Sequence, residues 1–389
     1  MLGFFSYYHL SIFLFLSLFL SLSHPCFPAR TIPDQVTVIT AESDVRNNAS
    51  TWHEFTRFLD AQKGSHVNGM SDLKKYLQRF GYLPGTVPDN TNTNTSTSTS
   101  TNSTDDNFDT QLESAIILYQ TKLGLPVTGK LDADTISTII SPRCGVADDA
   151  AAAAPPPPHG NATLRTTRHY AYFYGKPRWV RTSPMTLSYA FTPNAMINYL
   201  SPTDVRRVFR RAFSRWSAVI PVNFTETGEY LLADIKIGFY RGDHGDGEPF
   251  DGVLGVLAHA FSPENGRFHL DAAETWTLDF EEERSKSAID LESVATHEIG
   301  HLLGLGHSSV KEAVMYPSLS PRTKKVDLKI DDVEGVQALY GSNPNFKLSS
   351  LLESENSYNQ SLSSTTSKLS NWPFFFSLIL FILFLPTTI

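Results

Sequence analysis

Residues 297–307 read HEIGHLLGLGH, and this stretch decides the fold and the class of the protein. His297 and His301 are four positions apart, so on a helix they lie one turn apart on the same face and can bind one metal ion. Glu298 comes next round the helix, where it can reach a water molecule at the metal without binding the metal itself. Gly304 is expected to end the helix, because glycine adopts the positive φ of a sharp turn. That turn would return His307 to the same ion as a third ligand.

Three neutral imidazoles leave one position of a tetrahedral zinc ion open, which is typical of a catalytic site and not of a closed structural one. HExxH alone would also suit a histidine-rich amphipathic helix in a core. The longer H-E-x-x-H-x-x-G-x-x-H pattern, followed at short range by AVMYP at 313–317, is typical of metzincins. Met315 is then expected to lie beneath the ion with a structural role.

The 389 residues leave room for two domains plus processing segments, and a hydrophobic content of 41% supports real cores. The net charge of −8 and the lack of a basic stripe argue against nucleic acid as a partner. Residues 1–29 are predicted to be a secretory signal peptide, with an uncleaved anchor as the alternative. Residues 374–385 form an apolar run too short to span a bilayer as a helix. Behind small residues, it indicates a glycosylphosphatidylinositol (GPI) signal, while a tail anchor and a dispensable tail stay open.

Residues 52–140 carry three helical patterns, each with one apolar face. They predict a small bundle interrupted by the polar loop 89–106, which cannot bury a core. The Ala- and Pro-rich stretch 149–168 is the clearest domain boundary. Arg165 and Arg168 within it form a minimal processing site, although two arginines in a linker can also be incidental.

After this boundary the pattern becomes mixed α/β, with strands expected at 185–191, 233–240, 255–261 and 268–276. A helix is expected to begin at Pro202 with Ser201 as its N-cap. A second should span 288–304, and a third should begin at Asp331 with Glu334 completing a capping box.

Cys144 is the second of two cysteines, and Cys26 is expected to leave with the signal peptide. A disulfide is then impossible by count. A thiolate is a better zinc ligand than water, so Cys144 can occupy the open position and keep the protein latent. Cutting the linker or oxidising the thiol would free the site. The alternative is a buried cysteine that acts as a small hydrophobe.

HEIGHLLGLGH, AVMYP and PRCGVAD (142–148) together resemble the matrix metalloproteinase family, in its plant-type, membrane-anchored form without a hemopexin-like domain. The likeness covers about 52–341. It implies an α+β fold: a metzincin zinc-protease domain, with a twisted mixed five-stranded sheet and three helices, preceded by a three-helix peptidoglycan-binding-like propeptide domain. In the family's switch sequence, the residues matching Arg143 and Asp148 pair to hold the loop, and Ala147 stands where proline is usual. The segments implied are a signal peptide (1–29), a propeptide with bundle and cysteine switch (30–148), a linker removed on activation (149–168), a catalytic domain (169–345), a Ser-rich stalk (346–364) and a GPI-anchor signal (365–389).

The resemblance implies a secreted zinc endopeptidase (EC 3.4.24), made as a zymogen, that hydrolyses extracellular proteins at the cell surface. Zinc lowers the pKa of its water toward ~7, and Glu298 would take the proton and deliver it to the departing amine. Expected partners are protein or peptide substrates, an activating protease and the plasma membrane, reached through the lipid anchor. We expect a monomer on the extracellular face of that membrane, with the apoplast or extracellular matrix as a second location. The rival hypothesis is an inert cell-wall-binding or adhesion protein that uses the bundle as its binding module.

The resemblance also implies a structural zinc ion and calcium. The residues at matching zinc positions are His244, Asp246, His259 and His269. For calcium, which prefers oxygen ligands, they are the carboxylates of Asp251, Asp271 and Glu274 and the backbone oxygens of Gly252, Leu254 and Val256. An acidic loop without an ion is the alternative. Asp234 matches a second calcium position, which is less secure because the stretch before His269 is shortened.

Two residues bear on specificity by the same resemblance. Ser293 stands at the floor of the pocket for the residue after the scissile bond, and its small side chain implies a deep pocket for Leu-like or aromatic groups. Leu319 stands where tyrosine is common and makes that wall more apolar. An extracellular route is further indicated by six N-x-[ST] sequons, at Asn48, Asn94, Asn102, Asn161, Asn223 and Asn359.

Overall fold

The structure is a computed structural model that describes residues 51–84, 106–148, 169–347, 349 and 351. All of these residues belong to one compact unit, Asn48–Ile389. The predicted signal peptide, the linker with its two arginines, the anchor signal and most of the polar loop and stalk lie outside the described residues. So do five of the six sequons, and the sixth residue, Asn223, is exposed on a strand. None of the described helices is long and apolar enough to cross a membrane.

The first part of the described chain is the predicted bundle of three α-helices: α2 (Met70–Arg79), α3 (Thr110–Lys122) and α4 (Ala133–Ile139). Their apolar faces form one core, which also receives aromatic side chains from a 3-10 helix, η1 (Thr51–Phe58), that the sequence analysis did not foresee. Asp109 and Asp132 cap α3 and α4, because their carboxylates accept backbone N–H groups of the first turn. The three-helix prediction is confirmed.

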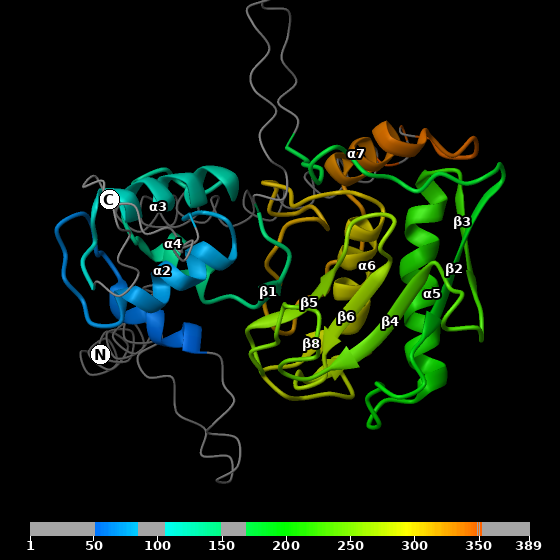
Figure 1. Cartoon of the computed structure of the whole chain (residues 1–389), viewed down its shortest axis with the longest axis horizontal. Coiled ribbons are helices and arrows are strands. Elements are labelled where there is room, and N and C mark those ends of the chain that lie inside the picture. Colours follow the sequence, from blue (N-terminus) through cyan, green and yellow to red (C-terminus); the bar gives the residue numbers. More distant parts are fainter. Residues whose placement is uncertain (1–50, 85–105, 149–168, 348, 350, 352–389) are drawn as a thin grey trace, which may run out of the picture. The chain divides into compact units, whose positions relative to one another are not determined.

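The second part is built on a mixed sheet with the strand order β1-β5-β6-β4-β2-β3 (Figure 1). The strands are β1 (Arg143–Cys144), β2 (Met185–Phe191), β3 (Val222–Glu226), β4 (Ile235–Tyr240), β5 (Val256–Ala260) and β6 (Arg267–Asp271). Strand β5 is antiparallel to β6, and the other pairs are parallel. Five strands come from beyond the linker, as predicted, although β3 had no sequence signal that we recognised. The sixth, β1, carries the candidate switch cysteine.

Three helices complete the second part: α5 (Pro202–Val219), α6 (Leu291–Leu302) and α7 (Ile330–Tyr340) (Figure 1). The short strands β7 (Trp276–Thr277) and β8 (Ile289–Asp290) pair just before α6. Helices α5 and α6 share one hydrophobic core with the sheet, and the indole of Trp216 donates to Thr296 O of α6 at 2.8 Å. This packing fixes the helix that bears the HExxH pattern against the sheet.

Two details of helix capping differ from the prediction. Ser201 precedes α5, but its side chain makes no capping hydrogen bond. Helix α7 begins one residue earlier than expected, and the carboxylate that accepts the backbone N–H of its N-cap, Lys329, belongs to Asp332 and not to Glu334. The sequence analysis therefore predicted the right kind of cap for α7, an acidic residue three positions after the N-cap, but it chose Glu334 in place of Asp332.

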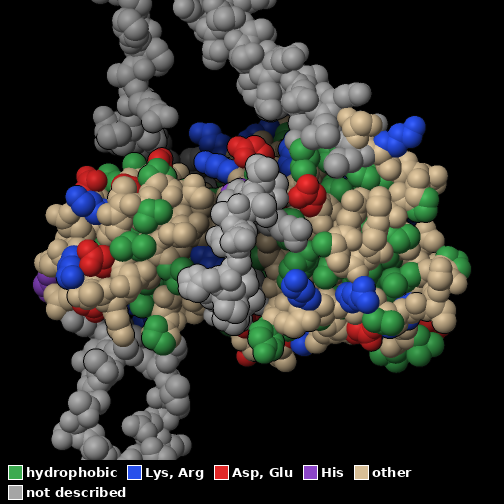
Figure 2. All heavy atoms as spheres, turned by 90° about the horizontal axis from the view of Figure 1, so that it is seen from above, with side chains coloured by type: hydrophobic (Ala, Val, Ile, Leu, Met, Phe, Trp, Pro, Cys, Tyr) green, Lys and Arg blue, Asp and Glu red, His purple; other side chains and the backbone are tan. Residues whose placement is uncertain are grey.

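Charged side chains of both signs are interspersed on the face shown in Figure 2, among hydrophobic and neutral groups. Helix α5 illustrates how they pair, because Arg206 binds Glu226 and Arg211 binds Glu292. The second pair is notable because the Glu292 side chain is only 3% exposed. It therefore links α5 to the first turn of α6.

Candidate active site and metal centres

Helix α6 positions the first two histidines and the glutamate of the pattern. Its N-cap Asp290 accepts the Ser293 N–H at 2.8 Å, and His297, Glu298 and His301 follow on buried turns. The helix ends at Leu302, and Gly304 has a φ of 102°. A side chain at Gly304 would meet the carbonyl oxygen of Pro177 as well as strain the backbone. The predicted glycine turn is thus present, and it brings His307 back beside the helix.

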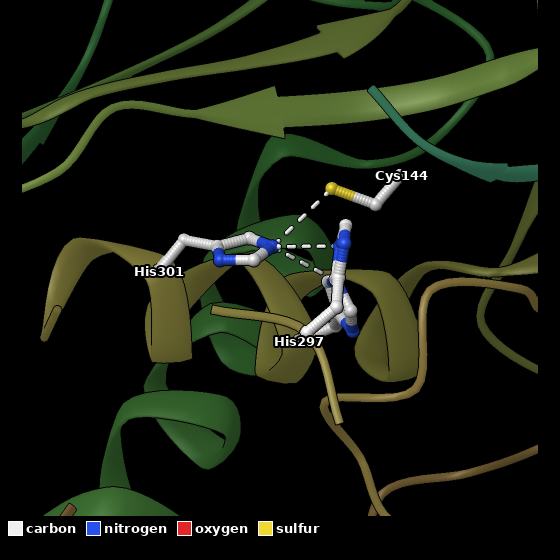
Figure 3. Close-up of side chains that lie close together, drawn as sticks. Cys144, His297 and His301 are labelled. Carbon is white, nitrogen blue, oxygen red and sulfur yellow. Dashed lines mark hydrogen bonds between the residues drawn. The ribbon is translucent and has the colours of Figure 1, made fainter. Parts of the chain in front are cut away.

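The three histidines converge on one point. The Nε2 atom of His301 lies 3.1 Å from Nε2 of His297 and 3.1 Å from Nε2 of His307. The Sγ atom of Cys144 lies 3.4 Å from the same Nε2 of His301. Figure 3 shows the cysteine and histidine side chains pointing toward one another. All four side chains are buried and form a group that could hold a metal ion. These separations are slightly shorter than the tetrahedral edges of about 3.3–3.6 Å that follow from Zn–N bonds of about 2.0–2.1 Å and a Zn–S bond of about 2.3 Å, and so they are close to those of a zinc site.

The other ring nitrogens determine which atoms carry lone pairs. Nδ1 of His297 donates to Val314 O at 2.7 Å, and Nδ1 of His301 donates to Leu305 O at 2.8 Å. Because a carbonyl oxygen can only accept, both Nδ1 atoms carry the proton. Nδ1 of His307 likewise donates to an Asp148 carboxylate oxygen at 2.6 Å. The three Nε2 lone pairs therefore face one another, an arrangement that only a shared cation stabilises, so the side chains fit a zinc ion.

A buried ion pair holds the cysteine segment against this centre. The Arg143 side chain is 0% exposed and donates to both oxygens of Asp148, at 2.7 and 2.9 Å. Asp148 also accepts the hydroxyl of Tyr82 at 2.6 Å. Burial alone would raise the pKa of Asp148, but the Arg143 charge and the His307 hydrogen bond hold it well below its usual range. The pairing of Arg143 with Asp148 occurs as the resemblance implied, while the Tyr82 and His307 contacts were missed because they span 66 and 159 residues of sequence.

Glu298 is fully buried beside the histidines, and neither of its carboxylate oxygens has a hydrogen-bond partner in the described part of the chain. Burial raises its pKa to about 8, which the nearby Cys144 thiol and the Ala260 N–H oppose only in part. Burial also raises the pKa of the Cys144 thiol, and the Glu298 charge adds to this effect. A buried, unpartnered carboxylate next to a metal position is suited to accepting a proton.

Met315 lies under α6, as predicted. A Cβ atom at Gly300 would collide with its sulfur atom, so this glycine is required for the helix to sit on the methionine turn. The buried carboxylate of Asp332 accepts the backbone N–H groups of Val314 at 2.9 Å and Met315 at 3.0 Å. Asp332 thereby fixes the segment of Val314 and Met315, and the carbonyl group of Val314 orients His297. The sequence analysis missed Asp332, because its neighbours there lie 17 and 18 residues away.

The four residues predicted to bind a structural zinc ion also come together, as a second group that could hold a metal. One carboxylate oxygen of Asp246 lies 2.9, 2.8 and 2.7 Å from nitrogen atoms of His244, His259 and His269, respectively. Burial lowers the pKa of both His259 and His269 to about 4, although Asp246 opposes the shift. Three imidazoles and a carboxylate, all with side chains at most 8% exposed, form a closed set of the structural type.

The residues predicted to bind calcium lie in one loop region. There the backbone N–H groups of Gly252, Leu254 and Val256, whose carbonyl oxygens were expected as ligands, donate to the carboxylates. Asp271 and Glu274 are buried, and their carboxylates accept the N–H groups of Gly252 at 3.2 Å and Leu254 at 2.7 Å. Asp251 likewise accepts the Val256 N–H at 2.8 Å. Burial raises the pKa of Asp271 to about 6 and that of Glu274 to about 8, and the neighbouring carboxylates reinforce both shifts. One Glu274 oxygen is buried without a partner, so the cluster fits a cation that would relieve the repulsion.

Calcium at Asp234 stays a prediction, and the side chain of this residue is already engaged by other groups. One oxygen of this carboxylate binds the Arg181 guanidinium at 3.1 Å. The other accepts both the N–H and the hydroxyl of Ser188 at 2.8 Å. Arg181 in turn binds Glu264 at 2.8 Å. A protein cation therefore already pairs with the side chains of both acidic residues.

A cavity beside the catalytic histidines has an empty volume of about 310 Å³, part of which opens to solvent. Ser293 and Leu319 both line it, as the resemblance implied. The hydroxyl of Ser293 donates to Asp290 at 2.6 Å and accepts the Lys325 N–H at 2.7 Å. Lys325 also lines the cavity, and nothing in the sequence singled it out. The described residues that line this cavity are Cys144, Leu257, Ser293, Val294, His297, Glu298, Val314, Tyr316, Pro317, Ser318, Leu319 and Lys325.

Comparison with known proteins identifies the family to which a chain with this site belongs. The matrixin family model matches residues 178–341, and the model of the putative peptidoglycan binding domain matches residues 66–139. Metalloendoproteinase 1-MMP of Arabidopsis thaliana is 55% identical over 338 residues, which cover 85% of this chain and 86% of that protein. Metalloendoproteinase 4-MMP of the same plant is 58% identical over 288 residues, covering 74% and 77%. Metalloendoproteinase 1 of Glycine max is 42% identical over 290 residues, covering 74% and 87%.

The fold, the trihistidine centre and these relatives define a zinc metalloendopeptidase. The chain belongs to the matrixin family and is of the plant type. Its cofactors are those of the family, a catalytic zinc ion, a structural zinc ion and calcium. The hypothesis of an inert binding protein is therefore set aside.

Proposed function

We propose that this chain is made as a zymogen and, once activated, hydrolyses peptide bonds of extracellular proteins at the cell surface. The observation that carries the proposal is the convergence of three imidazole Nε2 atoms and one thiol on a single point. His297, His301 and His307 would hold the catalytic zinc, with Cys144 as the fourth ligand of the resting state. His244, Asp246, His259 and His269 would hold the structural zinc, and the loop of Asp251, Asp271 and Glu274 would hold calcium.

A zinc ion bound by three imidazoles lowers the pKa of a water molecule at the site toward ~7. The buried Glu298 carboxylate lines the same cavity as Cys144 and has no competing hydrogen bond in the described structure, so it is available to accept the proton of that water. Oxygen adds to the peptide carbonyl carbon, the C–N bond breaks, and Glu298 delivers the proton to the departing amine. Carbonyl groups of Val314 and Leu305 keep His297 and His301 in the tautomer that leaves Nε2 free.

In the resting state the thiol excludes the water molecule that would act as the nucleophile. Three contacts fix the segment that carries the thiol. Its strand β1 pairs with β5, Arg143 and Asp148 form a buried ion pair, and Asp148 reaches His307. An activating protease would cut within residues 149–168 and release this segment. The predicted signal peptide at 1–29 and the predicted GPI signal at 365–389 support secretion and attachment to the plasma membrane. We further propose that the enzyme acts as a monomer.

The catalytic role is tested by Glu298→Gln in the full chain. We expect cleavage of a casein or gelatin substrate to be lost while zinc content, measured by atomic absorption, stays close to that of the wild type. Bands that persist in zymography with EDTA would contradict the zinc-protease mechanism.

Latency and anchoring have separate tests. Cys144→Ser should give a precursor that is active without cleavage of the linker, and unchanged latency would mean that steric cover alone inhibits the enzyme. Phospholipase C treatment of intact cells should release the enzyme if the anchor is a GPI lipid, and a spanning tail would resist it.

A further inference from the structure

Lys325 carries the one lysine or arginine side chain among the described residues that line the cavity beside the catalytic histidines. The remaining lining residues are mainly apolar or belong to the metal site. The ammonium nitrogen lies 5.1 Å from the ring centroid of Tyr316, which also lines the cavity. This cavity therefore combines apolar walls with one positive charge, where the family resemblance led us to expect a pocket for Leu-like or aromatic groups.

The charge of Lys325 has no acidic partner in direct contact among the described residues. Its Nζ donates to two backbone oxygens, Lys311 O at 3.1 Å and Ala313 O at 3.3 Å. An ammonium group has three N–H donors, so one of them remains without a partner in the described structure. The neighbouring Lys324 differs, because its more exposed ammonium binds Glu292 at 3.3 Å and Asp290 at 3.6 Å.

An ammonium group without a counter-ion is costly to bury, and the surroundings of Lys325 show this cost. Burial lowers the pKa of Lys325 to about 8, although Asp332 and Glu312 act in the opposite direction from farther away. The backbone N–H of Lys325 is fixed to Ser293 on α6 at 2.7 Å, so the residue is held at the floor of the cavity. The Ser293 hydroxyl already donates to Asp290, so the ammonium group of Lys325 is the charged donor that a substrate carboxylate can address in this cavity.

We propose that Lys325 determines specificity by supplying the counter-charge for a side-chain carboxylate of the residue after the scissile bond, so that the activated enzyme cleaves before glutamate as well as before apolar residues. This inference rests on the proposed peptidase function. The apolar walls would pack against the methylene groups of glutamate, and its carboxylate would accept the unused N–H of Lys325. Substrates with acidic residues at this position would thus be cleaved, whereas a purely apolar pocket would reject them.

The test compares three peptides that differ only after the scissile bond, with leucine, glutamate or glutamine there. The full chain, loaded with zinc and calcium and activated by limited proteolysis, is compared with Lys325→Met, Lys325→Arg and the control Lys311→Met. Lys311 is exposed and does not line the cavity, so its variant controls for the loss of a nearby charge. Cleavage of the leucine peptide and the Tm show that each variant is folded.

We expect Lys325→Met to lower kcat/KM for the glutamate peptide, relative to the leucine peptide, by about 10- to 100-fold, as for the loss of a charge-assisted hydrogen bond in a buried pocket. Lys325→Arg and Lys311→Met should keep the wild-type ratio within about 3-fold, and the glutamine peptide should be less sensitive than the glutamate peptide. A glutamate-to-leucine ratio that Lys325→Met leaves unchanged would overturn the inference. So would a wild-type enzyme that cleaves only the leucine peptide, although the proposed function would then stand. An enzyme that cleaves none of the peptides would overturn the proposed function and this inference with it.

Discussion

Asp148→Asn should open the resting enzyme without any cut in the chain. The Asp148 carboxylate is the acceptor for two hydrogen bonds from Arg143, one from Tyr82 and one from His307. Asparagine keeps the shape and one acceptor oxygen but loses the charge. Arg143, which is 0% exposed, would then be left in the interior without a counter-ion.

The size of the effect follows from that uncompensated charge. Removing one partner of a buried ion pair costs about 3–5 kcal/mol. Because the open state returns Arg143 to water, most of this loss should fall on the closed state. A change of about 3 kcal/mol corresponds to a more than 100-fold rise in the open population, at about 1.4 kcal/mol per tenfold.

The open population can be measured through Cys144, which is buried in the closed state. When closing is faster than labelling, the rate of modification by a thiol reagent is proportional to the open fraction. We expect Asp148→Asn to label at least 30-fold faster than the wild type. The control Asp72→Asn removes an exposed pair with Lys75 and should label at the wild-type rate. Labelling of Asp148→Asn within 3-fold of the wild type would refute the idea that this ion pair holds the segment closed.

Three further predictions concern stability. Burial raises the pKa of Glu292, but hydrogen bonds from Arg211 and Arg215 outweigh this effect and hold the pKa at about 2. This group should therefore contribute about 3 kcal/mol to the free energy of unfolding above pH 4.5, and this contribution is lost as the pH falls toward 2. In Glu292→Gln the acid limb of a plot of Tm against pH should be flatter between these values, and an unchanged limb would contradict this. Gly300→Ala should lower stability by about 1–3 kcal/mol in urea unfolding, because its methyl group meets Met315 sulfur. Burial raises the pKa of Glu274 to about 8, so without calcium the Tm should fall as the pH rises from about 4.5 to 8. Glu274→Gln or added calcium should make this fall smaller, and a fall that neither of them changes would contradict the site.

Local patterns made the catalytic centre predictable from sequence. His297, Glu298 and His301 are placed by the periodicity of one helix, and Gly304 by the φ that a sharp turn requires. The residues that tune this centre were not predictable in the same way. Asp332 and Tyr82 act across 17 to 66 residues of chain, and no periodicity or spacing rule links such positions.

Resemblance extended the prediction further, but only where this chain keeps the family's chemistry. The cluster of His244, Asp246, His259 and His269 came together as implied. At Asp234 the motif position did not reveal the ion pair with Arg181, so calcium there stays a prediction. Lys325 was overlooked because a lysine in a loop is ordinarily solvated, and its environment is visible only once the loop is folded against α6.

The pairing of β1 with β5 has a consequence for how substrates gain access. Arg143 N–H donates to Gly255 O, and Gly145 N–H donates to Ala258 O, so in the resting chain the backbone of this segment pairs with the outer edge of β5. When that segment leaves, the same carbonyl groups of β5 are unpaired, and an extended polypeptide can pair with this free strand edge as an added strand. Substrate and propeptide then compete for the same backbone groups of β5. Because the propeptide is tethered to the catalytic domain, its effective local concentration exceeds that of a free protein in solution. Cutting the linker removes this advantage, because the released propeptide then competes with the substrate as a free chain.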